Sequence, residues 1–335
     1  MRSEHVFDVV VIGGGLTGAA IARDAAMRGY ATLLLEKEDF GAGATGRSSG
    51  LAQGGLRDLD LLDLGPLRRA LAERATLERI APHLVRPLAC LRPVYAGDRQ
   101  PLWMVGVGLK FHAWLARERR ARARTIGAAE ARRLEPRLEP AGLAGAALYT
   151  DGQILSPERL CLETVLSARE AGAKAVNHVA VTALRPRADG ITEVDVESTL
   201  TGAADTVAGR VVVNAAGPWT DRLRRVASLT ERPTVRLARR LHLAVRCVAR
   251  HALVASARSD GRAFVVLPRR GWSVIATAGD GTDAEIDRVA ATAAEVDDLL
   301  AEARRLLPEA RLTQDDVFFA RAGVEALALA PSGRT

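Results

Sequence analysis

The sequence predicts an α/β fold in which a largely parallel sheet, covered by helices, is joined to a second, α+β domain built on an antiparallel sheet. The valine-rich run at residues 7–12 suits a strand that is buried on both faces. A glycine-rich turn at 13–18 and a helix-like stretch to about residue 27 follow it at once. Much later, alternating runs between residues 241 and 278 indicate antiparallel strands.

The glycine-rich turn has the pattern G-x-G-x-x-G, which suits a bound dinucleotide. Gly13 permits the tight turn, Gly15 leaves room for a pyrophosphate, and Gly18 lets the helix pack close to the sheet. The helix N-terminus adds free N–H groups and partial positive charge. The next apolar run, residues 31–35, ends on Glu36, which is spaced to accept hydrogen bonds from ribose hydroxyl groups. Together these elements predict a Rossmann-like dinucleotide-binding domain.

Composition is typical of a globular protein with about two domains. The chain has 335 residues, of which 48% are hydrophobic, and no apolar run reaches the ~18 residues that a membrane-spanning helix needs. Its three cysteines are widely spaced, and its six histidines lack metal-ligand spacing. We therefore expect a cytoplasmic protein without a structural metal, and with no signal peptide before the first strand.

The net charge of +7 comes largely from arginines, which cluster at residues 115–133. A solvated helix surface is the favoured interpretation, and attraction to anionic lipid is the alternative. We expect no nucleic-acid partner, because few aromatic residues stand among the charges and none forms a stacking platform.

Residues 41–50 form a second segment rich in glycine and hydroxyl groups. A loop of this composition offers many free backbone N–H groups. A nicotinamide-binding unit needs no second glycine-rich lining here, whereas the long ring of a flavin would explain one. A surface loop is the alternative interpretation.

The middle of the chain predicts helices separated by proline-rich breaks. A helix is expected over 66–80, after which prolines at 82, 87 and 93 interrupt the pattern. The apolar stretch 101–114 predicts either a core helix or an amphipathic helix on a membrane surface. Residues 149–152 predict a turn, and Ser156 is expected to cap a helix that runs to about residue 170.

The second half of the chain is mostly strands. Strands are expected at 175–184, 192–198, 207–213, 241–248, 263–268, 272–278 and 315–322, with a helix at 290–307. The strand at 207–213 ends in the sequence N-A-A-G-P-W. Small residues at the carboxyl end of a parallel strand let a cofactor lie close to the backbone.

These motifs together resemble those of FAD-dependent glycerol-3-phosphate dehydrogenases. In chain order they are G-G-G-L-T-G at 13–18 with Glu36, S-S-G-L-A-Q-G-G-L-R at 48–57, A-P-H-L at 81–84, N-A-A-G-P-W at 214–219, and His242. The first motif is shared by many flavoproteins, whereas the combination is much more specific. The resemblance spans nearly the whole chain.

The resemblance implies a flavoenzyme that oxidises glycerol 3-phosphate to dihydroxyacetone phosphate by hydride transfer to FAD. The electrons would pass to a quinone at the cytoplasmic face of a membrane, where the protein would bind peripherally, or to oxygen. The expected FAD-binding domain is discontinuous, and comprises residues 1–83, 148–224 and 311–335. The expected substrate domain comprises residues 84–147 and 225–310.

The resemblance also assigns site residues. Besides the pyrophosphate glycines and Glu36, the implied FAD contacts are Thr45, Ser48, Ser49, Leu51, Val179, Ala216 and Gly217. Arg57 matches a substrate-binding arginine, whose guanidinium suits a phosphate, although a surface arginine is the alternative. His242 matches a histidine of the substrate-domain sheet. A neutral imidazole there would accept the hydroxyl proton, and a satisfied core histidine is the alternative.

The chain departs from the family pattern at several substrate-side positions. Gly50, Gln53 and Asp58 stand where the family has lysine, histidine and tyrosine, and Glu325 replaces a substrate arginine. Because an acid repels a phosphate and attracts a cation, a flavin oxidase for an amine or amino acid is the second hypothesis. A catalytically inactive FAD-binding protein is the third, since the chain ends before the glycine-lysine-threonine segment that closes over the flavin in the family.

Overall fold

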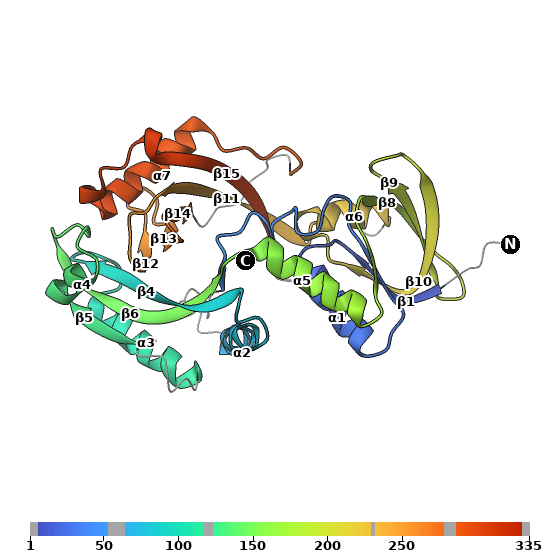
Figure 1. Cartoon of the computed structure of the whole chain (residues 1–335), viewed down its shortest axis with the longest axis horizontal. Coiled ribbons are helices and arrows are strands. Elements are labelled where there is room, and N and C mark those ends of the chain that lie inside the picture. Colours follow the sequence, from blue (N-terminus) through green and yellow to red (C-terminus); the bar gives the residue numbers. More distant parts are fainter. Residues whose placement is uncertain (1–5, 53–63, 117–122, 229–231, 278–285, 330–335) are drawn as a thin grey trace.

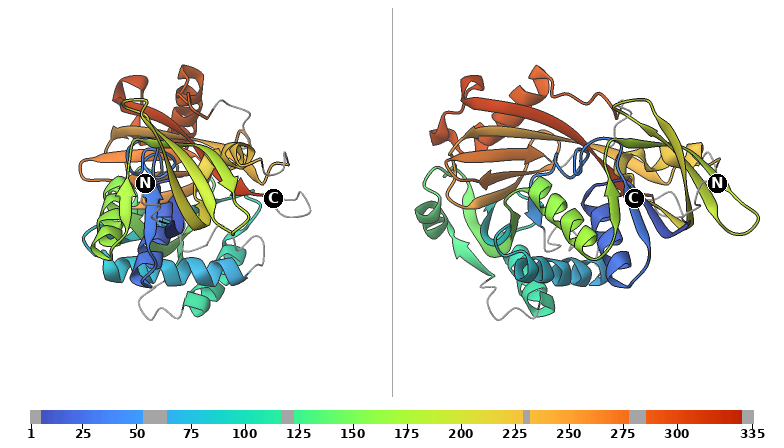
Figure 2. Two further views of the ribbon diagram at one scale, coloured as in Figure 1. Left: turned by 90° about the vertical axis from the view of Figure 1, so that its right-hand side faces the viewer. Right: turned by 45° about the vertical axis from the view of Figure 1, so that its right-hand side comes forward.

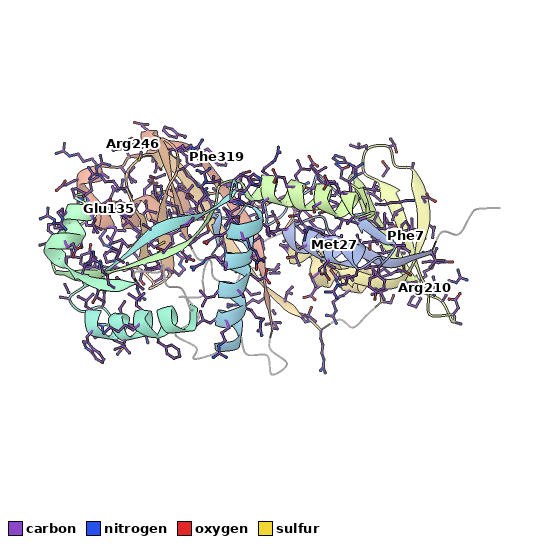
Figure 3. All side chains as sticks on the ribbon, turned by 60° about the horizontal axis from the view of Figure 1, so that its bottom comes forward. Phe7, Met27, Glu135, Arg210, Arg246 and Phe319 are labelled. Carbon is purple, nitrogen blue, oxygen red and sulfur yellow. The ribbon has the colours of Figure 1, made fainter. Side chains whose placement is uncertain are left out.

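The computed structural model describes residues 6–52, 64–116, 123–228, 232–277 and 286–329. These residues form two lobes that lie end to end along the long axis of the molecule (Figure 1). A six-stranded sheet forms one lobe and a nine-stranded sheet the other. In Figure 3, Phe7, Met27 and Arg210 mark the first lobe, and Glu135, Arg246 and Phe319 mark the second.

The six-stranded sheet has the order β7-β2-β1-β10-β9-β8. Its strands are β1 (Val6–Ile12), β2 (Thr32–Leu35), β7 (Lys174–Val176), β8 (Val179–Pro186), β9 (Thr192–Ser198) and β10 (Ala204–Asn214). In this order the first four strands, β7, β2, β1 and β10, are parallel to one another. The last two, β9 and β8, pair antiparallel with their neighbours. Val10 and Val11 of β1 are fully buried, and burying such a side chain contributes roughly 1.5–3 kcal/mol.

Helices cover both faces of this sheet. Helices α1 (Leu16–Met27) and α5 (Pro157–Glu170) lie side by side and share a core with one face, and α6 (Thr220–Val226) packs on the other (Figure 2). The short 3₁₀ turn η2 (Gly217–Trp219) precedes α6. The predicted cap of α5 is confirmed, because the Ser156 hydroxyl accepts a hydrogen bond from the Arg159 N–H at 3.2 Å.

The nine-stranded sheet has the order β15-β11-β14-β13-β12-β4-β6-β3, with β5 beside β6. Its strands are β3 (Leu51–Ala52), β4 (Val85–Tyr95), β5 (Arg124–Gly127), β6 (Leu143–Ile154), β11 (Val235–Arg246), β12 (Ala252–Ser256), β13 (Ala263–Pro268), β14 (Trp272–Thr277) and β15 (Val317–Ala328). Apart from the parallel pair β12 and β4, neighbouring strands are antiparallel. The predicted α/β fold with an antiparallel second sheet is thus confirmed.

Helices also cover the second sheet. They are α2 (Leu64–Ile80), α3 (Leu102–Ala116), α4 (Ala128–Leu134) and α7 (Ala293–Leu306), with 3₁₀ turns η3 (Pro308–Ala310) and η4 (Gln314–Asp316). Leu299 and Leu300 of α7 share a buried core with Leu241 and Leu243 of β11. Because side chains alternate along a strand, the even-numbered residues of β11 face away from α7.

One turn prediction and one strand prediction were wrong. The expected turn at 149–152 lies inside β6, where pairing with β4 and β3 overrides local turn propensity. The expected strand at 175–184 is two strands, because His178 adopts a positive φ of 56° and turns the chain between β7 and β8.

Two of the three prolines that were expected to interrupt the helical pattern after α2 lie within β4. Pro87 and Pro93 face Gly152 and Ala146 of β6. On its other side β4 pairs with β12 only at Cys90 and Leu91, so both prolines lie outside that short pairing. Proline is tolerated in a sheet where its missing N–H is not needed for pairing.

The C-terminal strand joins the second sheet. β15 pairs along its length with β11, whereas the sequence-based division assigned 311–335 to the FAD-binding domain. β6 likewise begins before residue 148 and lies in the same sheet. The exact domain boundaries stay a prediction.

A buried carboxylate holds one end of the second lobe together. Glu135 follows α4 and is 1% exposed. Its Oε1 accepts hydrogen bonds from the backbone N–H groups of Arg250 and His251 and contacts the His251 Nδ1 at 2.9 Å. The carboxylate therefore ties α4 to the segment that enters β12.

We expect Glu135→Ala to lower the free energy of unfolding by about 1–3 kcal/mol, because it leaves two part-buried backbone N–H groups without their acceptor. Glu135→Gln keeps an acceptor oxygen and is expected to cost less. Urea unfolding measures both, with Glu170→Ala, an exposed change at the end of α5, as the control. Equal stability of Glu135→Ala and wild type would contradict this role.

Candidate functional site

A cavity of about 440 Å³ lies in the first lobe where β1 and β2 end. Seven of the predicted cofactor residues line it: Gly13, Gly15, Glu36, Thr45, Val179, Ala216 and Gly217. The carboxyl ends of parallel strands, at the point where the sheet order reverses, are where open α/β sheets bind ligands. The structure therefore brings most of the predicted cofactor residues together at one cavity.

The glycine turn is determined by close backbone contacts. Gly13 has a φ of +113°, and a Cβ there would lie 2.4 Å from the carbonyl oxygen of Ala215. A Cβ on Gly18 would lie 1.9 Å from the carbonyl oxygen of Gly13. Gly18 does not line the cavity, so its role is to bring α1 against the end of β1.

The N-terminus of α1 faces the cavity, since Gly15, Leu16 and Thr17 line it. Gly15 is the N-cap and supplies no side-chain acceptor, and the first turn contains no acidic residue. The Thr45 hydroxyl accepts a hydrogen bond from the Leu16 N–H at 3.0 Å. The positive end of the helix therefore suits a pyrophosphate.

Glu36 is held in place by backbone donors. One carboxylate oxygen accepts a hydrogen bond from the Gly14 N–H at 2.6 Å, and the other accepts one from the Glu38 N–H at 2.9 Å. Each oxygen has a further lone pair, so the carboxylate can still accept hydrogen bonds from a ribose. The glycine cradle, the helix end and this acid fit the ADP half of a dinucleotide.

Sequence reasoning missed a charged cluster at the same cavity. The Trp219 indole N–H donates to Asp287 at 2.7 Å, and Arg222 donates to the other oxygen of Asp287 at 2.7 Å. The Lys37 ammonium lies 3.4 Å from Asp287 and 4.0 Å from the centre of the Trp219 ring. The hydrogen bond from Trp219 is the largest of the effects that lower the pKa of Asp287. Trp219 ends the N-A-A-G-P-W motif and was therefore detectable, but no sequence pattern marks Asp287.

Three predicted flavin contacts lie beyond this cavity. Ser48, Ser49 and Leu51 belong to the segment that leads from the cavity to the second sheet, where Leu51 pairs with Gln153. The Ser49 carbonyl accepts a hydrogen bond from Arg269 at 2.9 Å. Their contact with flavin stays a prediction.

His242 lies on β11 of the second sheet and is 3% exposed. Within the described part of the chain, neither ring nitrogen has a hydrogen-bond partner, so it is not a satisfied core histidine. Burial, followed by the charges of Arg321 and Arg240, lowers the pKa of His242 to about 4. The ring is therefore neutral at physiological pH and can accept a proton.

The remaining substrate-side predictions divide into two groups. Arg57, Gln53 and Asp58 lie outside the described residues. Glu325 lies on β15 and forms an ion pair with Arg240 on β11. Its charge is therefore balanced within the sheet.

The model of one protein family, described as FAD dependent oxidoreductase, matches residues 8–334. A glycerol-3-phosphate dehydrogenase from Synechocystis is 36% identical over 96% of this chain. The chain spans only 61% of the length of that relative.

Solved structures agree with this similarity. The glycerol-3-phosphate dehydrogenase from Bacillus halodurans complexed with FAD is 30% identical, with a TM-score of 0.79 over 97% of this chain and 58% of its own. Glycine oxidase from Geobacillus kaustophilus shares the fold at 24% identity, with a TM-score of 0.75 over 98% of this chain and 84% of its own. Because the family model covers nearly the whole sequence and the cavity fits a dinucleotide, this chain belongs to the FAD dependent oxidoreductase family.

Proposed function

We propose that this chain oxidises glycerol 3-phosphate to dihydroxyacetone phosphate with FAD as its cofactor. The observation that carries the proposal is His242, a buried neutral imidazole with both nitrogens free of partners in the described residues. Relatives at 36% and 30% identity that are named glycerol-3-phosphate dehydrogenase support the substrate.

FAD, when bound, supplies a ring that accepts a hydride from the substrate carbon. The residues of the chain bind the cofactor, orient the substrate and accept the proton. The Gly13 turn and the N-terminus of α1 hold the pyrophosphate, and Glu36 holds the ribose. A ring nitrogen of His242 accepts the proton of the substrate hydroxyl as the carbon is oxidised. In this proposal Arg57 binds the phosphate group of the substrate.

The amine or amino acid oxidase hypothesis loses the observation that favoured it. Glu325 was expected to attract a cationic substrate, but its carboxylate forms an ion pair with Arg240. The similarity to glycine oxidase is below 25% identity and therefore bears on the fold alone. The hypothesis of an inactive FAD-binding protein is opposed by His242, whose neutral ring has one proton-accepting nitrogen and no hydrogen-bond partner among the described residues.

We further propose a peripheral contact with the cytoplasmic face of a membrane, where a quinone would accept the electrons. Helix α3 exposes Trp103, Met104, Val107 and Phe111 on one side, whereas Val105 and Leu109 are buried. An amphipathic helix with exposed aromatic and aliphatic side chains suits a lipid surface. Among the described residues, no helix has the length and apolar character needed to cross a bilayer.

Glu36→Ala should weaken FAD binding roughly 10- to 100-fold, because it removes the ribose acceptor and the partner of the Gly14 N–H. Titration of flavin-depleted protein with FAD, followed by the quenching of flavin fluorescence, measures the Kd. Glu197→Ala changes an exposed residue of β9 in the same sheet and should leave the Kd unchanged. An unaltered Kd in Glu36→Ala would refute the ribose assignment.

His242→Asn should slow anaerobic flavin reduction by glycerol 3-phosphate by roughly 10²- to 10⁴-fold, because it removes the proton acceptor. FAD content should stay unchanged. His83→Asn, an exposed change far along the chain, serves as the control. A His242→Asn enzyme that reduces flavin at the wild-type rate would disprove the role.

The pKa of about 4 also predicts how the His242 ring titrates. The neutral form is favoured in the folded chain, so the ring should stay neutral from pH 7 to about pH 5 and gain a proton only near pH 4. The stability that the neutral ring confers is accordingly lost as the pH falls from about 6.5 towards 4. NMR titration with His242→Asn for assignment tests this, and a midpoint near 6.5 would contradict it.

Trp103→Glu combined with Val107→Glu should reduce co-sedimentation with anionic phospholipid vesicles at low salt, because charges replace the apolar side of α3. Leu200→Glu is the matched control, since Leu200 is 73% exposed in the first lobe. The proposal fails if the wild-type protein stays in the supernatant or if the double variant sediments equally.

A further inference from the structure

We propose that Arg321 binds the anionic group of the substrate and holds the substrate against His242. The inference rests on the proposed function for the identity of the substrate, and it adds a substrate-binding residue that the sequence motifs do not mark.

The register of the sheet places the two side chains together. In the antiparallel pair of β11 and β15, which lie side by side in Figure 1, His242 is directly opposite Arg321. Directly opposed residues project from the same face of a sheet. That face is the one turned away from α7, because Leu241 and Leu243 pack under that helix. After burial, the positive charge of Arg321 is the next largest effect that lowers the pKa of His242, which agrees with the closeness of the two side chains.

The guanidinium of Arg321 is poorly neutralised by the residues that the structure describes. Its Nε is buried and has no hydrogen-bond partner among the described residues. The carboxylate of Glu158 lies 3.7 Å from Nη1, and that side chain is 48% exposed. An ion pair at this distance and exposure contributes little. Arg321 also lies 5.6 Å from the centre of the Phe319 ring.

Neighbouring arginines already have structural partners. Arg240 is paired with Glu325. Arg269 donates to the carbonyl groups of Ile154, Leu155 and Ser49 at 2.9–3.3 Å, and so fixes the segment that leaves the cavity. Among the described residues, Arg321 therefore has a weaker ion pair than Arg240, and the structure gives it no backbone acceptors of the kind that fix Arg269.

Arg321 also lies beside the segment that comes from the dinucleotide cavity. Gly323, two residues further on the same face of β15, approaches that segment so closely that a Cβ would lie 2.8 Å from the Cβ of Arg47. On the other side, a Cβ on Gly46 would lie 3.3 Å from Cγ of Glu158, the partner of Arg321. The pair His242 and Arg321 is thus adjacent to the chain that runs from Thr45 at the cavity to β3.

This arrangement matches the chemistry of a phosphorylated alcohol. A guanidinium presents paired N–H donors to a phosphate and remains charged at every relevant pH. A substrate held there by its phosphate would bring a nearby hydroxyl group to the neutral imidazole. From the resemblance, Glu325 was expected to repel the phosphate of the substrate. In this arrangement the positive charge of Arg321 attracts that phosphate.

The first experiment compares charged and neutral substrates on the FAD-loaded enzyme. Arg321→Gln should lower kcat/KM for glycerol 3-phosphate roughly 10- to 100-fold, mainly through KM, and leave kcat/KM for glycerol almost unchanged. Arg321→Lys should lower kcat/KM for glycerol 3-phosphate by a smaller factor, because it keeps the positive charge but not the paired donors. Arg236→Gln, an exposed change on β11, is the control. An unchanged KM for glycerol 3-phosphate in Arg321→Gln would overturn the inference and leave the proposed function standing.

A binding measurement separates the two proposals if glycerol 3-phosphate is not oxidised. Inorganic phosphate, titrated by calorimetry into FAD-loaded wild type, should bind more tightly than it binds to Arg321→Gln. Glu158→Gln should change phosphate affinity little, because the ion pair of Glu158 with Arg321 is long and half exposed. Equal phosphate affinity in wild type and Arg321→Gln, or no binding to wild type, would overturn the inference.

Discussion

The close approach of the glycine turn to the strand ends is the constraint on which the first lobe depends. With no side chains at Gly13 and Gly18, the end of β1, the start of α1 and the end of β10 come within contact distance. The same approach points the positive end of α1 into the cavity and lets Glu36 accept the Gly14 N–H. A side chain at either glycine would force the backbone apart, so packing and cofactor geometry are inseparable here.

In this account the second lobe supplies the proton acceptor, His242, and the charged side chains around it. His242 has no hydrogen-bond partner among the described residues, and burial, followed by the charges of Arg321 and Arg240, keeps its ring neutral. Two arginines near His242 differ in their partners. Arg240 forms a close ion pair with Glu325, whereas the carboxylate nearest to Arg321 in the described part of the chain is Glu158, at 3.7 Å. An apparently unfavourable acid at position 325 is thus compatible with an anionic substrate, because the sheet supplies its counter-charge.

The sequence predicted the dinucleotide half well because its signals are local. Strand, glycines, helix and acid lie within about 30 consecutive residues, and each glycine has a steric reason that holds in any such turn. The second lobe was harder to predict. Pairing placed the expected turn at 149–152 inside β6 and carried β4 through two prolines. Arg321 became informative only through its register with His242, and Asp287 only through contacts with residues distant in sequence.

The measurement that tests the central claim most directly is the absorption spectrum of the FAD-loaded protein during anaerobic addition of glycerol 3-phosphate. The account predicts that the flavin bands bleach in wild type. Bands that persist would contradict the proposed substrate. A purified protein that neither carries flavin nor takes it up from solution would contradict the account of the cavity itself.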